Sequence, residues 1–384
     1  MKKKLSFVST VLTLLFAMCF KATAPKKLLF SQELQDVLYN GLKTTGGTGV
    51  SAAVIVTGEG EWVGVSGLSD PKMAETIKPN MLFDIASVGK TFTAALVLQL
   101  VEEGRLELED PLHKWLPDFP NIDNTVTIRQ LLNHTSGISH FTENPSYWET
   151  VFKDLDSLWT PEDILAFVPE PHFPPGGGWH YSSTNYVLLG MIIEKATEST
   201  LTTQLRNRIF IPLKLNHTFT PLDREETLSG TFAHAHFDLD GNGELDDMGY
   251  LPRKSIFSAV WASGPIVSTA EDLARWAESL YSSRVLKKES LDQMIDFHRP
   301  TPGEPLISGY GLGTAEFPSE FFEGERAWGH LGWQPGYMTA MLYFPNHSVS
   351  LSVLINDNNE DCITYIAIGL WSIIKNHLEV TGQH

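Results

Sequence analysis

Two pairs of strand-like segments lie at opposite ends of this chain, and they constrain the fold more than any other pattern. Residues 50–56 form an apolar run, and a Gly-Glu-Gly turn separates them from a second run at residues 62–65. Near the other end, residues 337–344 and 349–355 repeat this arrangement around a Pro-Asn turn, and a helical sequence at residues 362–378 closes the chain. Apolar runs bounded by turn residues predict paired strands. We therefore expect one sheet built from both ends of the chain.

The sequence between these strand pairs is mostly helical. Thr160 is followed by Pro161 and two acidic residues, which is the pattern of an N-cap, a first-turn proline and early acids. Ser268 and Glu271 have capping-box spacing, and residues 186–196 form another apolar helix. The expected fold is α+β, with an antiparallel sheet flanked by helices and an inserted α-helical lobe.

The first residues have the pattern of an export signal. Lysines at residues 2–4 precede an apolar stretch at residues 5–20, and a small-x-small cleavage site follows at Ala22 and Ala24. The apolar stretch is too short to span a bilayer comfortably. We predict export to the periplasm or the exterior after cleavage behind Ala24. The alternatives are an uncleaved anchor or lipidation at Cys19, and either would attach the protein to the membrane.

The predicted division of the chain follows from these patterns. Residues 1–24 are a signal peptide, and residues 25–384 form one domain. Within that domain, an α/β lobe takes about residues 25–90 and 285–384, and a helical lobe takes about residues 91–284. A chain of this length buries enough surface for two closely packed lobes.

Charge and cysteine content exclude several classes of protein. The formal net charge is −18, and removal of the lysine-bearing signal peptide makes the chain more acidic still. An acidic exported protein is unsuited to binding nucleic acid or an anionic membrane, and we expect no stable membrane span once the signal peptide is cleaved. Cys362 is then the only cysteine, so no internal disulfide forms and stability must come from the core.

A serine and a lysine three residues apart, Ser87 and Lys90, are the strongest catalytic candidates. On a helix they lie on one face, where the lysine can take the serine proton or help another base to take it. The helix-forming run at residues 91–103 places Ser87 near a helix N-terminus, which favours developing negative charge. The same spacing recurs at Ser372 and Lys375, but inside an apolar C-terminal helix, so we interpret Ser372 as structural.

Two further motifs extend this pattern, namely Tyr181 with Ser183, and His330 with Gly332. With them the chain resembles serine β-lactamases and penicillin-recognising DD-peptidases, above all the class C β-lactamase-like branch. That branch includes DD-carboxypeptidases, D-aminopeptidases and certain esterases. The resemblance spans roughly residues 46–357, and it implies that residues 25–384 form a β-lactamase-like catalytic domain. The segments that carry it are residues 83–93, 103–111, 127–137, 175–176, 181, 185–186, 188–190, 264 and 268–272. So many agreements in the right order are far more specific than one motif.

The resemblance implies catalytic roles for three residues. Ser87 is the nucleophile by its position in the motif. A charged Lys90 lowers the pKa of a neighbouring phenol, because it favours the anion. Tyr181 is that phenol, and beside Lys90 it can accept the Ser87 proton and later return it to the leaving group.

The third motif implies a strand at the edge of the sheet beside the nucleophile. His330 and Gly332 stand where many relatives carry Lys-Thr-Gly, and Gly332 lets the substrate approach the backbone closely. An oxyanion hole is implied from the backbone N–H groups of Ser87 and Trp333, and one such donor is worth about 3 kcal/mol of barrier. His330 is either neutral or cationic at working pH, so it can tune Tyr181 or meet a substrate carboxylate.

The sequence departs from its relatives at two points. Ser183 replaces an asparagine that usually touches the amide side chain of the substrate, which affects substrate recognition but not acyl transfer. A carboxypeptidase also needs a cation for the terminal carboxylate, and the candidates are Arg326, Arg253 and His330.

One segment resembles a metal site. Residues 238–243 start like an EF-hand loop, but the twelfth position is Gly249 instead of the glutamate that such a loop needs. The Asp-Gly and Asn-Gly steps favour a hairpin turn there. We expect no metal ligands and no cofactor requirement.

We therefore predict an exported serine hydrolase that acts through an acyl-enzyme and takes a small-molecule or peptide substrate. The carbonyl belongs to a cell-wall peptide, a β-lactam or an ester, as in DD-carboxypeptidases and β-lactamases. One alternative is an esterase or D-amino-acid amidase of the same fold, since the fold does not choose among substrates. An alternative of another class is a penicillin-binding sensor or scaffold that is acylated but does not turn over.

Overall fold

The computed structural model describes residues 27–221, 231–249, 253–264, 266–298, 301, 303 and 305–382. The predicted signal peptide, residues 1–24, lies outside these ranges, so its cleavage and export stay predictions. Within the described ranges, no helix combines the length and the apolar character needed to cross a bilayer.

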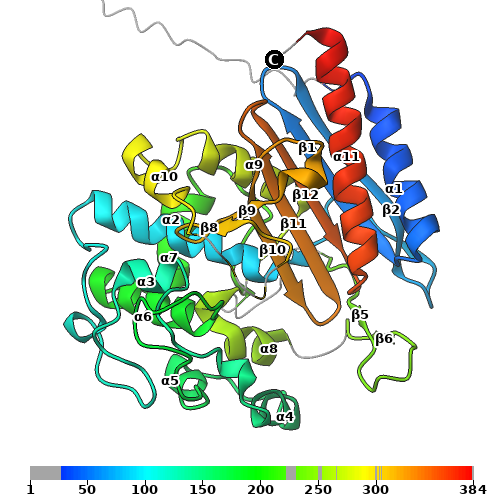
Figure 1. The fold of residues 1–384 in the computed structure, drawn as a ribbon. Coiled ribbons are helices and arrows are strands. Elements are labelled where there is room, and N and C mark those ends of the chain that lie inside the picture. Colours follow the sequence, from blue (N-terminus) through cyan, green and yellow to red (C-terminus); the bar gives the residue numbers. More distant parts are fainter. Residues whose placement is uncertain are drawn as a thin grey trace, which may run out of the picture.

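The main sheet of the described residues is antiparallel and has eight strands, and strands from both ends of the chain pair within it (Figure 1). The strand order is β3-β2-β1-β12-β11-β10-β9-β8. The strands are β1 Gly49–Val56, β2 Gly60–Asp70, β3 Glu75–Thr76, β8 Gly309–Tyr310, β9 Ala315–Phe317, β10 Ala327–Gln334, β11 Tyr337–Phe344 and β12 Val349–Ile355. β1 pairs with β12, with Val50 opposite Ile355, so the predicted sheet built from both chain ends is confirmed.

Helices cover both faces of this sheet because its side chains alternate between two apolar layers. On one face lie α1 (Ser31–Thr45) and α11 (Glu360–Thr381) (Figure 1). They pack against side chains such as Ala52 of β1. On the other face lies α9 (Ala270–Tyr281), in the core layer that contains Ala53. Although α9 falls within the range predicted for the helical lobe, it packs on the sheet. The predicted lobe boundaries stay a prediction.

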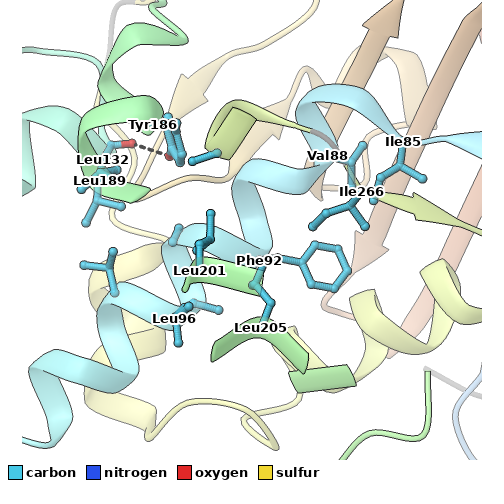
Figure 2. Packing of buried hydrophobic residues seen from close by; sticks show 14 of the residues in the cluster. Ile85, Val88, Phe92, Leu96, Leu132, Tyr186, Leu189, Leu201, Leu205 and Ile266 are labelled. Carbon is cyan, nitrogen blue, oxygen red and sulfur yellow. Dashed lines mark hydrogen bonds between the residues drawn. The ribbon is translucent and has the colours of Figure 1, made fainter. Parts of the chain in front are cut away.

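The remaining helices lie together on one side of the sheet (Figure 1). They are α2 Gly89–Glu102, α3 Ile128–Leu132, α4 Ser146–Lys153, α5 Pro161–Leu165, α6 Thr184–Thr197, α7 Leu201–Leu205, α8 Arg253–Val260 and α10 Lys288–Met294. Of these, α2 packs against α6 and α7. Phe92 and Leu96 of α2 belong to one buried cluster with Leu189 of α6, and Figure 2 shows both beside Leu205 of α7. Because α2 is buried along almost its whole length, the residues in its first turn are held in one position.

The helix-start signals are confirmed at one helix and shifted at another. Thr160 caps α5 and accepts a hydrogen bond from the Asp163 N–H at 3.2 Å. α9 is capped by Thr269, which accepts from the Asp272 N–H at 3.3 Å, so the capping residue predicted at Ser268 is wrong by one position. The reason is that Ser268 belongs to a short strand, β7, which pairs with β4 (Phe83–Asp84) just before the nucleophile.

The hairpin predicted at residues 238–243 is confirmed. β5 (His236–Phe237) and β6 (Asp246–Asp247) pair antiparallel on either side of it. The Asp238 carboxylate accepts hydrogen bonds from the N–H groups of Gly241 and Gly243, both at 2.8 Å. The Asp238 side chain therefore closes this loop onto its own backbone.

Candidate active site

Ser87 stands at the start of the buried helix α2. It lies in a short 3-10 turn, Ala86–Val88, and its side chain is half-buried at the wall of a cavity. Ala86 has a φ of 47°, which is the left-handed region, and its N–H donates to the Asp84 carboxylate at 2.8 Å. A strained residue that its surroundings hold in place is common beside a catalytic group. The turn therefore presents the Ser87 hydroxyl to the cavity.

Lys90 lies one helical turn further on and is fully buried. Its Nζ is 2.9 Å from the Ser87 Oγ and donates to the Ser263 carbonyl at 2.8 Å. It also lies 5.1 Å from the ring centroid of Tyr181. Burial lowers the pKa of the Lys90 amine to about 7, because desolvation disfavours the ammonium. At neutral pH a large fraction of Lys90 is the free amine, which can accept a proton from Ser87.

Tyr181 is half-buried and lines the same cavity as Ser87. Its ring lies 4.4 Å from the ring of His134, centroid to centroid. The Nδ1 of His134 accepts from the Ser182 N–H at 3.1 Å and lies 3.2 Å from the amide nitrogen of Asn185. His134 thus fixes the backbone at Ser182, the residue that follows Tyr181. The sequence reasoning counted residues 127–137 only as part of a family segment and missed this role.

His330 is buried and is neutral at pH 7. Burial is the main reason that its pKa falls to about 3, and the nearby Lys90 lowers it further. Its Nδ1 lies 2.5 Å from the Leu331 carbonyl, and its Nε2 lies 2.8 Å from the hydroxyl of Tyr310. A carbonyl can only accept, so Nδ1 carries the proton and Tyr310 donates to Nε2. The cationic form that the sequence left open is thereby disfavoured, and Tyr310 is a site residue that the sequence did not single out.

Gly332 lies where β10 crosses the segment that leads to Ser87. A Cβ at this position would stand 2.2 Å from the carbonyl oxygen of Ile85, far closer than two such atoms approach. The requirement for glycine here is therefore set by the protein's own backbone, which differs from the predicted approach of substrate.

β10 is also not the edge strand that the sequence predicted, because β9 and β8 follow it in the sheet. The pairing with β9 covers only Ala327, Trp328 and Gly329. Among the strands that the structure describes, none pairs with β10 from His330 onward on that side, and this part of the strand lines the cavity.

We expect Gly332→Ala to lower both stability and activity. The new methyl group must push β10 away from the Ile85 backbone, and overpacking of this kind costs about 1–3 kcal/mol of unfolding free energy. Urea titration and kcat/KM on the same preparation check the result. Gly369→Ala on α11 is the matched control, since its Cβ would meet only the movable side chain of Val37. Equal, small effects of the two substitutions would contradict the close approach.

Trp333 and Ser183 occupy contrasting positions. Trp333 is 49% exposed and lines the cavity that Ser87 and Tyr181 also line. Ser183 is 6% exposed, precedes α6 at its N-cap position and does not line the cavity. The structure therefore brings Ser87, Lys90, Tyr181, His330, Gly332 and Trp333 together, whereas Ser183 is buried outside the cavity wall.

The candidate cations for a substrate carboxylate are not gathered at this cavity. Arg326 is bound to the Glu316 carboxylate, with nitrogen–oxygen distances of 2.6 and 3.0 Å, and does not line the cavity. Arg253 begins α8, and its side chain is not among those that the structure describes. Among the described residues of the cavity wall there is no arginine or lysine, and the histidine there, His330, is neutral.

Comparison with known proteins gives a consistent set of matches. The family described as "Beta-lactamase" matches residues 34–367. Penicillin-binding protein 4* of Bacillus subtilis (strain 168) is 32% identical over 297 residues, which cover 74% of this chain and 62% of that protein. The chain spans a little under two thirds of the length of the curated relatives it matches.

Two solved structures match over almost their whole length. A D-stereospecific amidohydrolase from Streptomyces sp. is 32% identical, with a TM-score of 0.75, and the match covers 87% of this chain and 97% of that one. The D-amino acid amidase from Ochrobactrum anthropi SV3, complexed with L-phenylalanine, is 26% identical, with a TM-score of 0.80 and coverage of 90% and 99%. The predicted resemblance and the predicted α+β fold are thus confirmed.

Proposed function

Because the chain belongs to the β-lactamase family, we propose that it is a serine acyl hydrolase that cleaves an ester or amide through an acyl-enzyme at Ser87. One observation carries this proposal. The Ser87 hydroxyl lies 2.9 Å from a buried lysine amine whose pKa is lowered to about 7, at the wall of a large cavity. A nucleophile beside a base of this pKa is suited to proton transfer at neutral pH.

The proposed reaction has two halves. In the first, the Ser87 Oγ attacks the substrate carbonyl while the free amine of Lys90 takes its proton. The leaving amine or alcohol then receives that proton, through Tyr181, as the carbon–leaving-group bond breaks. In the second half, water attacks the ester on Ser87 and gives a proton to the same groups, which pass it to the Ser87 oxygen as the bond to the acyl carbon breaks and the acid leaves. The backbone N–H groups of Ser87 and Trp333 are the proposed donors to the oxyanion.

The character of the cavity favours an amide or a simple ester over a DD-carboxypeptidase substrate. A terminal carboxylate buried in this cavity would need a cationic partner. The described lining residues offer none, and Glu360 and Asp361 add negative charge at its wall. The likeness to a D-stereospecific amidohydrolase and a D-amino acid amidase over nearly their whole length supports the same choice. The proposal includes export of the protein by its signal peptide, which places the reaction outside the cytoplasm.

A substrate panel tests this proposal. We expect p-nitrophenyl esters and D-amino-acid p-nitroanilides to be hydrolysed with a higher kcat/KM than peptides ending in D-Ala-D-Ala or the β-lactam nitrocefin. Intact-protein mass spectrometry after mixing should show an acyl adduct that decays on the time scale of turnover. An adduct that persists, with no product, would instead identify a penicillin-binding sensor. Preferred cleavage of D-Ala-D-Ala peptides would restore the carboxypeptidase assignment.

A further inference from the structure

The catalytic cavity does not end at the reacting groups. It has a volume of about 820 Å³, and its wall runs from Ser87 past Tyr181 to side chains in the core layer beneath α11, against which Tyr181 also packs. Pockets for small ligands typically measure roughly 300–1,000 Å³. Well-packed interiors leave few voids larger than a water molecule. A cavity of this size, which extends from the reacting groups to the α11 face of the sheet, therefore points to a ligand.

The part of the cavity at Ser87 and the part beneath α11 meet at β10, beyond the residues that pair with β9. The register of β10 with β11 places Leu331 opposite Ala340 and Trp333 opposite Met338. Cross-strand partners share a face of the sheet, so these four side chains lie together on one face. Ala340 and Met338 pack in the core layer below α11, so that face is the α11 side. All four residues line the cavity, which therefore continues from the Ser87 side of β10 to the α11 side.

The wall beneath α11 is apolar and is built partly from small side chains. Leu342 of β11 and Phe322 line it, and α11 contributes Ile363 and Ala367. These four residues are all buried in the core layer of that face. Ala340 and Ala367, whose side chains are single methyl groups, are among the smallest apolar residues of this wall.

We propose that this part of the cavity binds a long, neutral, apolar chain attached to the carbonyl carbon that Ser87 attacks. This inference rests on the proposed acyl hydrolase function and names its substrate class, namely esters or amides of medium to long aliphatic acids. After acylation only the acyl part stays on Ser87, so a chain bound here remains in place through both half-reactions. Glu360 and Asp361 at the wall disfavour a chain that ends in an anion.

Chain length is the variable that tests this inference. For p-nitrophenyl esters from acetate to decanoate, we expect kcat/KM to rise with each methylene, by up to about fourfold while the chain is being buried, which corresponds to about 0.8 kcal/mol per methylene. Ala367→Leu fills the cavity and should lower the decanoate-to-acetate ratio about tenfold or more. Thr364 is exposed on α11 and lines the cavity, so Thr364→Trp narrows the cavity without repacking the core and should also lower this ratio.

Asn376→Trp is the matched control for Thr364→Trp. It adds the same ring to the same helix at an exposed site that does not line the cavity, and it should leave the ratio unchanged. A flat chain-length profile, or a ratio that neither cavity substitution alters, overturns the inference while the hydrolase function stands. A preference for long alkyl acetates over long-chain acyl esters assigns the chain to the leaving group and also overturns it.

A binding measurement separates this inference from catalysis. Calorimetry with decanamide on the Ser87→Ala protein should show saturable binding that Ala367→Leu weakens and Asn376→Trp does not. If no ester, amide or β-lactam is hydrolysed in a Ser87-dependent manner, the proposed function fails. The titration still shows whether the cavity binds an aliphatic chain. No binding of decanamide to the folded protein overturns the inference.

Discussion

Ser87→Ala is expected to lower kcat/KM by at least about 10⁴-fold and to abolish covalent labelling by a fluorophosphonate. Loss of the nucleophile in a serine hydrolase removes nearly all of the rate enhancement, and what remains comes from binding and oxyanion stabilisation. The Lys90 amine cannot substitute, because it is fully buried behind Ser87. Labelling followed by peptide mapping and steady-state kinetics measure both effects.

The chain carries its own control for this experiment. Ser372 and Lys375 have the same spacing on α11, but the Lys375 Nζ donates to the Glu323 carbonyl at 2.8 Å, and Ser372 does not line the cavity. Ser372→Ala should therefore leave labelling and kcat/KM unchanged. Labelling of Ser87→Ala at the rate of the wild-type protein would show that the nucleophile lies elsewhere.

Lys90→Met is expected to lower kcat by about 10³-fold or more and, at neutral pH, to raise the free energy of unfolding. A methionine has no base to take the Ser87 proton, and general base catalysis contributes about 10²–10⁴-fold. An apolar side chain of similar length also removes the cost of burying an ammonium. Gains in stability at the expense of activity are typical of catalytic positions. Kinetics and urea titration on one preparation measure both quantities.

The pH dependence of the unfolding free energy of the wild type and of Lys90→Met gives a sharper test. Burial lowers the pKa of Lys90 from 10.5 to about 7, so the folded protein binds fewer protons than the unfolded chain between these values. The cost of the buried lysine is complete below about pH 7 and decreases as the pH rises towards 10.5. The stability advantage of Lys90→Met over the wild type should therefore be largest at low pH and shrink above pH 7.

The activity of the wild type should follow the free amine. We expect kcat/KM to rise with pH and to level off above about pH 7, as Lys90 loses its proton. Lys90→Arg should be inactive at every pH in this range, since a guanidinium keeps its proton. If Lys90→Met keeps the wild-type rate and the same rise of kcat/KM with pH, the base must be another group.

The secondary structure near both chain ends could be predicted closely because it depends on neighbouring residues. The predicted strand at residues 337–344 coincides with β11, and the strand at residues 349–355 coincides with β12. The cap at Thr160 was also correct. The error at Ser268 has a non-local cause, since its pairing partner Phe83 lies in a segment far away in the sequence.

The candidate site was only partly predictable. Ser87, Lys90 and Tyr181 could be named from their motifs, but the group that fixes the Lys90 amine, the Ser263 carbonyl, is 173 residues away along the chain. The hydrogen bond from Tyr310 that accompanies the neutral state of His330 has no local signature either. The apolar cavity needs β10, β11 and α11 to be in place before its shape exists.

Reactive groups, their spacing and the local elements that carry them could thus be read from the order of residues, because helix periodicity and strand alternation act between near neighbours. The charge states of Lys90 and His330, the reason for glycine at 332 and the volume beneath α11 arise from the fold. These properties depend on how much water and which atoms surround a group, and its surroundings come from segments that are far apart in the sequence.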